Sequence, residues 1–193
     1  MNAEHSLSTP KNVRHAISID ERRAFFRQNQ FDLAHVETGQ DWKEFWFPGV
    51  HCDVGGGYPE DASGLWLVAF DWMVAEAVGH QLAVDPVRLN LVRNHGRPAP
   101  AQPWLQPAQE SLEGLWKLLE YYPKRHWEEK RGYYYRPNLG RPRFIRDGSL
   151  IHQSALLRVQ AGGYRPRNFS DSFIESVNSL TSVPETVPFK FAP

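Results

Sequence analysis

Residues Glu44–Tyr58, with the sequence EFWFPGVHCDVGGGY, join a dense apolar run to a histidine, a carboxylate and three consecutive glycines. A short apolar run that ends abruptly predicts a buried strand, here over residues 45–50. His51 and Asp53 follow that strand directly. In open α/β sheets, ligands and reacting groups gather just beyond the carboxyl ends of the strands. The stretch therefore predicts a functional site at the end of a buried strand.

Two interpretations of His51 and Asp53 are open. Histidine is the usual general base because its pKa lies near neutral pH, and alternate residues of an extended strand point to the same face. Alternatively, His51 is a buried histidine bonded to a backbone carbonyl. Asp53 is expected to hold the loop in either case, because residues this close rarely align for a carboxylate–imidazole bond. Gly55, Gly56 and Gly57 allow positive φ angles and close backbone approach, so they are expected to shape the same loop.

Cys52, between these two residues, is the single cysteine of the chain. A thiol nucleophile is one interpretation, but adjacent strand residues face opposite sides, so a small buried thiol is favoured. A metal site formed by His51, Cys52 and Asp53 is possible by ligand type. However, the sequence contains no supporting C-x2-C or H-x3-H spacing. We therefore expect neither a metal nor another cofactor.

The composition indicates one globular domain with a substantial core and no strong bias in charge. The chain has 193 residues, of which 41% are hydrophobic, and a net charge of zero at pH 7. This balance gives no reason to expect a nucleic-acid partner. The first twenty residues lack the apolar segment of a signal peptide, and no run of about 18 apolar residues suggests a membrane span. We expect a cytoplasmic protein without an internal disulfide.

Hydrophobic periodicity and turn residues outline the remaining elements. We expect a disordered tail over 1–12, a main domain over 13–168 and a peripheral tail over 169–193. Asp61 or Ser63 is expected to cap the helix that Gly79 ends. The other expected elements are a short helix within 13–26, helices over 65–79, 85–94, 112–122 and 149–159, an irregular excursion over 96–109, and a turn over 137–140.

Residues 124–146 combine basic and aromatic side chains. Such a segment resembles a surface that contacts phosphate groups and has stacking partners, with Arg136, Arg141 and Arg143 as candidate contacts to phosphates or lipid headgroups. The alternative is a solvated face whose long side chains cover apolar surface. His152, on an apolar helical face, is expected to be a core or capping histidine.

A recognisable nucleophile is missing from the sequence. Hydrolases of the α/β type place a serine on a G-x-S-x-G elbow, and their triad follows the chain order serine, acid, histidine. None of the twelve serines lies between such glycines. A chain in which an early strand leads to a histidine matches the second half of that order.

The segment WFPGVHCDVGGGY, Trp46–Tyr58, closely resembles the hallmark of the α/β-hydrolase family catalogued as domain of unknown function 2235. Relatives in this family include phospholipase effectors delivered by type VI secretion. Three further segments are similar to the family, and the resemblance spans residues 13–168. They are HAISIDERRAFF (15–26), LLEYYPKRHW (118–127) and RPNLGRPRFIRDGSLIHQSALLRV (136–159).

The resemblance implies an α/β-hydrolase-like fold and a Ser-Asp-His triad that cleaves carboxylic esters, with lipids as substrates. His51 matches the family's catalytic histidine, whereas Asp53 and Gly55 to Gly57 match the surrounding loop. Cys52 replaces the usual serine, a nearly isosteric change. The resemblance also implies delivery by a secretion system that needs no signal peptide.

The family's serine elbow, of GFSRGA type, and its Asp-Thr-Val segment normally lie upstream and are absent from the sequence. We therefore expect an incomplete hydrolase-like domain, corresponding to the carboxyl-terminal part of the family domain. It would supply the triad histidine, be inactive alone and have the upstream half as its partner. The alternative is a degenerate hydrolase fold that binds a protein partner or anionic lipid headgroups through peripheral membrane contact.

Overall fold

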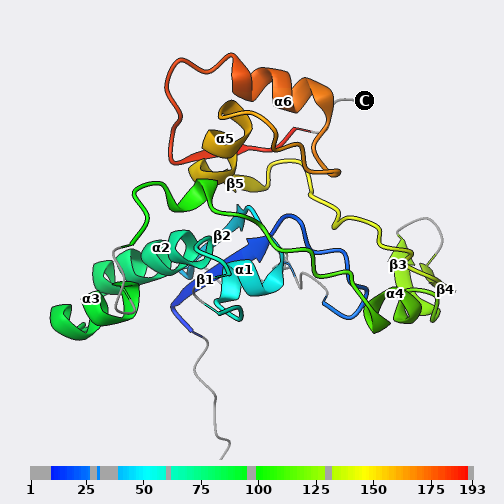
Figure 1. Cartoon of the computed structure of the whole chain (residues 1–193), viewed down its shortest axis with the longest axis horizontal. Helices are drawn as coiled ribbons and strands as arrows, with labels where there is room; N and C mark the ends of the chain where they lie inside the picture. The colour runs from blue at the N-terminus through cyan, green and yellow to red at the C-terminus, as the bar shows by residue number, and fades with distance from the viewer. Residues whose placement is uncertain are drawn as a thin grey trace, which may run out of the picture.

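The computed structural model describes residues 10–26, 30, 39–59, 62–94, 99–128 and 132–190, which form a mixed sheet with helices and a separate β-hairpin (Figure 1). The sheet contains β1 (Asn12–Ser18), β2 (Asp41–Phe47), β5 (Leu150–His152) and β6 (Thr186–Pro188), and the hairpin contains β3 (Lys124–Glu128) and β4 (Gly132–Arg136). The helices are α1 (His51–Gly55), α2 (Trp66–Gly79), α3 (Pro86–Asn94), the 3-10 helix η2 (Pro103–Leu105), α4 (Leu115–Leu119), α5 (Gln153–Gln160) and α6 (Asp171–Asn178).

The sheet has the strand order β1-β2-β5-β6. The first three strands are parallel and β6 is antiparallel to β5, so the architecture is broadly α/β, as predicted. The prediction of a helix within residues 13–26 is wrong, because β1 pairs with β2 along its whole length, from Asn12 opposite Asp41 to Ser18 opposite Phe47. A short apolar run does not distinguish strand from helix by periodicity alone. Pairing with β2 determines that this segment is a strand.

The strand predicted before His51 is confirmed as β2, although it runs from Asp41 to Phe47 and not over residues 45–50. Its last three residues, Phe45, Trp46 and Phe47, are at most 5% exposed because both faces of the sheet are covered. On one face, Phe45 and Phe47 pack against Trp72 of α2. On the other, Trp46 joins a larger core with Ile151 of β5 and residues of α5 and α6. The strand that leads to the candidate site is thus fixed from both sides.

The helices after the glycines follow the predicted pattern, except at one cap. α2 ends at Gly79 as predicted, but the Ser63 hydroxyl donates to Asp53 instead of capping α2. Asp61, the other predicted cap, lies outside the described residues. α3 starts at Pro86, where Asp85 Oδ1 accepts a hydrogen bond from the Val87 N–H at 2.9 Å. Asp85 therefore caps the amino-terminal end of the helix that was expected over 85–94.

The carboxyl-terminal half differs more from the predictions. The helix expected over 112–122 is limited to α4, which starts directly after Gly114 at φ 54°. The helix expected over 149–159 is divided into β5 and α5. Of the tail predicted for residues 1–12, residues 1–9 lie outside the described ranges, and Asn12 begins β1.

Residues 169–190 are not peripheral, contrary to the expectation for this segment. The Ser170 hydroxyl caps α6 by accepting a hydrogen bond from the Phe173 N–H at 3.2 Å. α6 then buries Phe173 and Val177, and Phe189 after β6 is 0% exposed in the same core. The polar composition of this segment concealed a short amphipathic helix.

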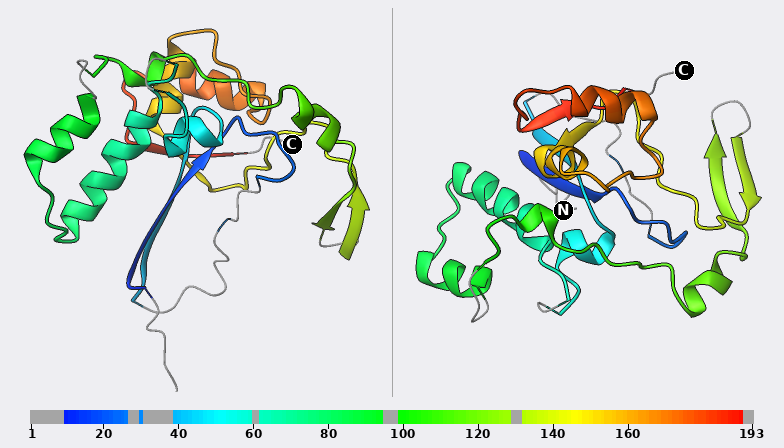
Figure 2. Two further views of the ribbon diagram at one scale, coloured as in Figure 1. Left: turned by 60° about the horizontal axis from the view of Figure 1, so that its bottom comes forward. Right: turned by 45° about the horizontal axis from the view of Figure 1, so that its top comes forward.

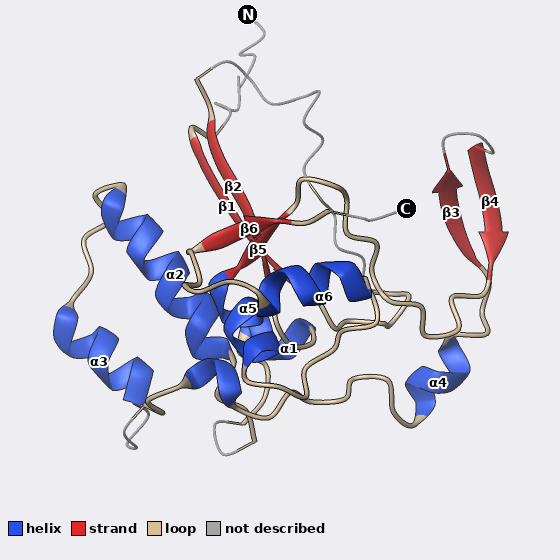
Figure 3. Ribbon diagram, turned by 90° about the horizontal axis from the view of Figure 1, so that it is seen from above, coloured by secondary structure: helices blue, strands red, loops and turns tan. Residues whose placement is uncertain are grey.

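The β3–β4 hairpin and α4 lie to one side of the sheet and its covering helices (Figures 2 and 3). Five residue pairs form the hairpin, from Lys124 opposite Arg136 to Glu128 opposite Gly132. The predicted turn at 137–140 follows the hairpin and does not connect its strands. None of the helices among the described residues is long and apolar enough to cross a membrane.

Candidate active site

The loop that leaves β2 is fastened by the buried carboxylate of Asp53. Asp53 Oδ2 accepts hydrogen bonds from the Val50 N–H at 3.0 Å and the Gln109 N–H at 3.1 Å. Its Oδ1 accepts a hydrogen bond from the Ser63 hydroxyl at 2.9 Å. His51 and Asp53 do not share a strand face as predicted, because both belong to the short helix α1, where His51 is exposed and Asp53 is 0% exposed.

Gly49 has φ +101°, and a Cβ atom on it would lie 2.6 Å from the Asp53 Cβ. We expect Gly49→Ala to destabilise the fold by about 2–5 kcal/mol, combining about 1–2 kcal/mol for a left-handed residue with about 1–3 kcal/mol for overpacking. The measurement is urea unfolding of both proteins. Gly39→Ala is the control, since Gly39 also has positive φ but an added Cβ would meet nothing within 4 Å. Equal effects of the two substitutions would contradict the proposed clash.

Glu21 holds the backbone at the start of α1. It is 1% exposed, and its Oε2 accepts hydrogen bonds from the His51 N–H at 3.1 Å and from Arg23 Nη2 at 2.8 Å. Its Oε1 accepts further hydrogen bonds from Ser111 Oγ and Arg23 Nε. Burial by itself would raise the pKa of Glu21, but the hydrogen bonds from Arg23 and His51 outweigh it and lower this pKa to about 2. Glu21 is therefore ionised at neutral pH.

Asp20, two residues after the end of β1, holds the same loop. Its Oδ2 accepts hydrogen bonds from the Gly49 N–H at 2.6 Å and from the Tyr164 hydroxyl at 2.9 Å. Burial raises the pKa of Asp20 to about 6, against the lowering effect of these hydrogen bonds. Together with Glu21 and Asp53, Asp20 fixes the backbone N–H groups from Gly49 to His51.

The His51 ring is exposed and lies 5.0 Å from the Phe26 ring, centroid to centroid. Among the described residues, no side chain hydrogen-bonds the imidazole. Partial desolvation and then the positive charge of Arg143 lower the pKa of His51 below its ordinary value, although Glu21 acts in the opposite direction. His51 is therefore neutral at pH 7, which is the state that a general base needs.

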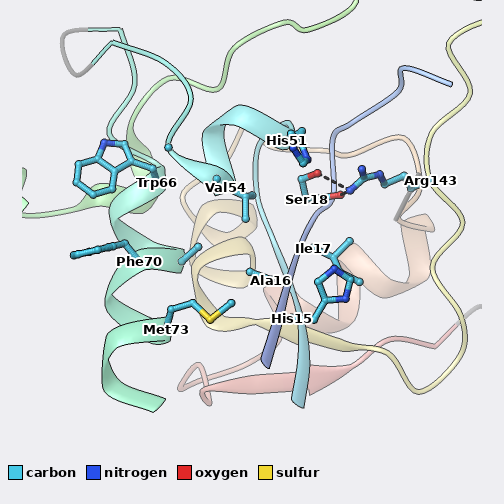
Figure 4. A pocket seen from close by; sticks show the side chains of 13 residues that line it. His15, Ala16, Ile17, Ser18, His51, Val54, Trp66, Phe70, Met73 and Arg143 are labelled. Atoms are coloured by element: carbon cyan, nitrogen blue, oxygen red, sulfur yellow. Dashed lines mark hydrogen bonds between the residues drawn. The ribbon is translucent and has the colours of Figure 1, made fainter. Parts of the chain in front are cut away.

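His51 lines a cavity of about 500 Å³ between β1, α1 and α2. Figure 4 shows His51, Ser18 and Arg143 at one end of this cavity, and Trp66, Phe70 and Met73 along its α2 wall. The cavity thus has a polar end with a base and a cation, and an apolar side. Such a site is suited to a substrate that joins a reactive polar group to an apolar chain.

Arg143 is held at this end of the cavity by the strand end and the loop that follows it. Arg143 Nη1 donates to the Ser18 carbonyl at 3.0 Å and to Ser18 Oγ at 2.6 Å, and Nη2 donates to the Phe26 carbonyl at 2.6 Å. Burial lowers the pKa of Arg143 to about 10, so the guanidinium stays charged at neutral pH. Arg143 is only 8% exposed. It therefore does not lie on the open surface that the sequence suggested.

The three predicted headgroup contacts differ in their exposure. Arg141 is exposed, whereas Arg136 is half-buried on β4, with its guanidinium 5.4 Å from the Tyr134 ring. A role for Arg136 and Arg141 in binding phosphate groups stays a prediction. His152 is confirmed as a core and capping histidine, because its Nδ1 accepts a hydrogen bond from the Ser154 N–H and burial lowers its pKa to about 4.

The glycines after α1 have separate positions. Gly56 has φ 75° and ends α1, and Gly55 and Gly56 both line the cavity. A Cβ on Gly57 would lie 2.9 Å from Sγ of Cys52, which is half-buried. Within the described ranges, no group of three or more His, Cys, Asp or Glu side chains is placed to hold a metal ion.

The sequence did not indicate that three further residues belong to the same site. They are Ser18, Glu21 and Arg143. Glu21 belongs to a charged cluster, Asp20 to Arg23, which suggests solvent exposure. The position of the cluster could have indicated that Glu21 belongs to the site. The cluster directly follows the apolar run that forms β1, and functional groups gather beyond the carboxyl ends of such strands. Arg143 was predicted as a phosphate or headgroup contact, and no local feature of the sequence indicated that it is buried beside Ser18.

A mixed sheet with helices on both faces and a histidine beyond the carboxyl end of a parallel strand define an α/β domain with a candidate active site at that end. Residues 2–76 match the family described as T6SS, phospholipase effector Tle1-like, catalytic domain. The match includes β1, β2 and α1, and therefore His51. The resemblance predicted from the sequence is confirmed for this part of the chain, and for residues 77–168 it stays a prediction. No curated protein and no solved structure matches the chain significantly.

Proposed function

We propose that this chain supplies the general-base histidine, His51, of a phospholipase-type hydrolase of carboxylic esters. The observation that carries the proposal is the position of His51 at the polar end of an apolar-walled cavity, within the residues that match the catalytic domain of phospholipase effectors. Its lowered pKa supports the same role. We also propose delivery by a secretion system that needs no signal peptide, as the family description suggests.

In ester hydrolysis by this route, the neutral imidazole takes a proton from the nucleophilic hydroxyl and later gives it to the leaving alcohol. The apolar wall formed by Trp66, Phe70 and Met73 is suited to an acyl chain. The hydrogen bonds of Asp20, Glu21 and Asp53 would keep the His51 backbone in place while the proton moves. Each group thus has a distinct part in one reaction.

The nucleophile is proposed to come from a segment outside these 193 residues. Ser18 lines the cavity, but its hydroxyl oxygen accepts a hydrogen bond from Arg143 rather than being paired with His51. Among the described residues, β1 pairs with β2 alone, so its other edge is available to a further strand beside the cavity. Pairing of an added strand with a sheet edge is a common mode of association.

The test is hydrolysis of a short-chain ester and of a phospholipid by this chain alone and with an upstream segment that carries the elbow serine. We expect activity only when both parts are present, in one polypeptide or two. Mutation of the elbow serine to alanine in the upstream segment is the control. Activity of this chain alone would contradict an external nucleophile, and Ser18→Ala and Cys52→Ala would then identify an internal one. A folded chain that is inactive in every combination would contradict the hydrolase proposal.

A further inference from the structure

Residues 115–146, here called the basic aromatic lobe, include α4, the β3–β4 hairpin and the segment after it. The hairpin and α4 stand to one side of the sheet in every view (Figures 1, 2 and 3). Of the 15 large hydrophobic side chains that are exposed within the described ranges, eight lie in this lobe. They are Leu115, Leu118, Tyr121, Tyr122, Tyr133, Tyr135, Leu139 and Phe144. Such a concentration marks a surface that binds a partner.

The lobe is also strongly basic, although the whole chain has no net charge. Residues 115–146 contain nine Lys and Arg and three Asp and Glu, a difference of six positive charges. One of the three acids, Glu120, is 2% exposed, and its carboxylate accepts hydrogen bonds from the Ala24 N–H, the Asn138 side chain and the Gly140 N–H. One of the nine basic residues, Arg143, is 8% exposed at the cavity, so the two buried charges cancel and the difference of six remains. The surface therefore favours an anionic partner.

One face of the hairpin is open to such a partner. In the strand register Arg125 lies opposite Tyr135, so both side chains point to the same face, which Tyr133 shares. Tyr133 and Tyr135 are 66% and 70% exposed, and the Arg125 guanidinium lies 4.2 Å from the Tyr133 ring centroid. On the opposite face, Lys124 Nζ lies 3.0 Å from the Phe25 ring centroid, so this face turns toward the rest of the protein.

The lobe contacts the segment after β1, and that segment contacts the candidate base. The Trp116 ring lies 5.6 Å from the Phe26 ring, and the Phe26 ring lies 5.0 Å from the His51 ring. The Asn138 side chain donates to the Arg22 carbonyl at 2.8 Å. A surface that binds to the lobe would therefore lie near the polar end of the cavity.

We infer that the basic aromatic lobe docks on anionic lipid bilayers. Tyrosine rings prefer the depth of the lipid headgroups, and lysine and arginine are attracted to the negative surface of the bilayer. A nucleic acid would satisfy the positive charge, but it would leave Leu115 and Leu118 exposed. The inference deepens the proposed function and rests on it for the identity of the substrate, since docking would bring His51 to the lipid.

The test is co-sedimentation of the full chain with vesicles of phosphatidylcholine alone or mixed with phosphatidylglycerol. We expect binding to the anionic vesicles that weakens with added salt. Arg125→Gln should weaken it roughly fivefold, the effect of one basic residue at a bilayer surface. Tyr133→Ala combined with Tyr135→Ala should weaken it by a similar or larger factor. These side chains are exposed, so an unchanged thermal unfolding transition verifies that each variant is folded.

The matched control is Val87→Ala combined with Leu91→Ala on α3, where both side chains are at least 65% exposed outside the lobe. This control should bind vesicles as the unmodified chain does. Equal loss in the control and lobe variants would overturn the inference, as would displacement from vesicles by an equimolar single-stranded oligonucleotide. Vesicle binding is also measured for the His51→Ala variant. This variant should bind vesicles as the unmodified chain does, so a failure of the docking inference can be distinguished from a failure of the proposed hydrolysis.

Discussion

His51→Ala is expected to lower kcat/KM of the completed hydrolase by roughly 10²–10⁴-fold, the usual contribution of a positioned general base. The fold should remain intact, because the imidazole is exposed and the bond to Glu21 comes from the His51 backbone N–H, which alanine retains. The measurement is steady-state hydrolysis of a short-chain ester, with thermal unfolding of each variant. Binding of the upstream segment should also be unchanged.

His80→Ala is the matched control for this substitution. His80 follows α2 and bonds to Arg14, away from the residues that line the cavity. We expect its removal to leave hydrolysis within about threefold of the unmodified enzyme, as for a surface change of a few tenths of a kcal/mol. A completed enzyme that keeps its activity after His51→Ala would show that His51 is not the base.

The titration of His51 gives an independent check on the same role. In the chain alone, its imidazole should titrate below the ordinary pKa of about 6.5, because desolvation and the charge of Arg143 disfavour the protonated ring. Addition of the upstream segment should raise this pKa if that segment places a carboxylate beside the ring. The activity of the completed enzyme should then fall as the pH drops through the raised value. NMR titration of the imidazole protons in both states measures the shift.

Glu21→Ala is expected to destabilise the fold by about 3–5 kcal/mol, the usual cost of removing one partner of a buried ion pair. It would leave the Arg23 guanidinium, which has a side-chain exposure of 8%, without its carboxylate. It would also remove the acceptor for the His51 N–H and for the Ser111 hydroxyl. Urea unfolding measures the change.

Glu110→Ala is the comparison for Glu21→Ala, since Glu110 pairs with the neighbouring Arg22 but its side chain is 45% exposed. An exposed pair contributes about 0–1 kcal/mol, so this variant should be nearly as stable as the unmodified chain. Similar values for the two variants would contradict the assigned role of Glu21. The pH provides a second test, because the Glu21 pKa of about 2 lies below the ordinary glutamate value of 4.5. Its contribution should be present above pH 4.5 and be lost as the pH falls through about 2, and Glu21→Gln should remove this dependence.

The sequence by itself determined the elements whose signals are local. The apolar run before His51 predicts β2, Gly79 predicts the end of α2, and Asp85 with Pro86 predicts the start of α3. In each case, neighbouring residues in the chain carry the physical cause, which is burial, backbone freedom or capping. The order of Trp, His, Asp and three glycines also pointed to the family that residues 2–76 match.

Only the tertiary structure decided which charged residues are buried. Glu21 and Arg143 lie in polar segments of the sequence, yet each is at most 8% exposed. Their partners are distant in the chain, as in the bond of Glu21 to Ser111, 90 residues away, or of Arg143 to Ser18, 125 residues away. Burying a charge is unfavourable unless such partners are already in position. The sequence therefore indicates the candidate base, whereas the folded chain determines the groups that position it and set its pKa.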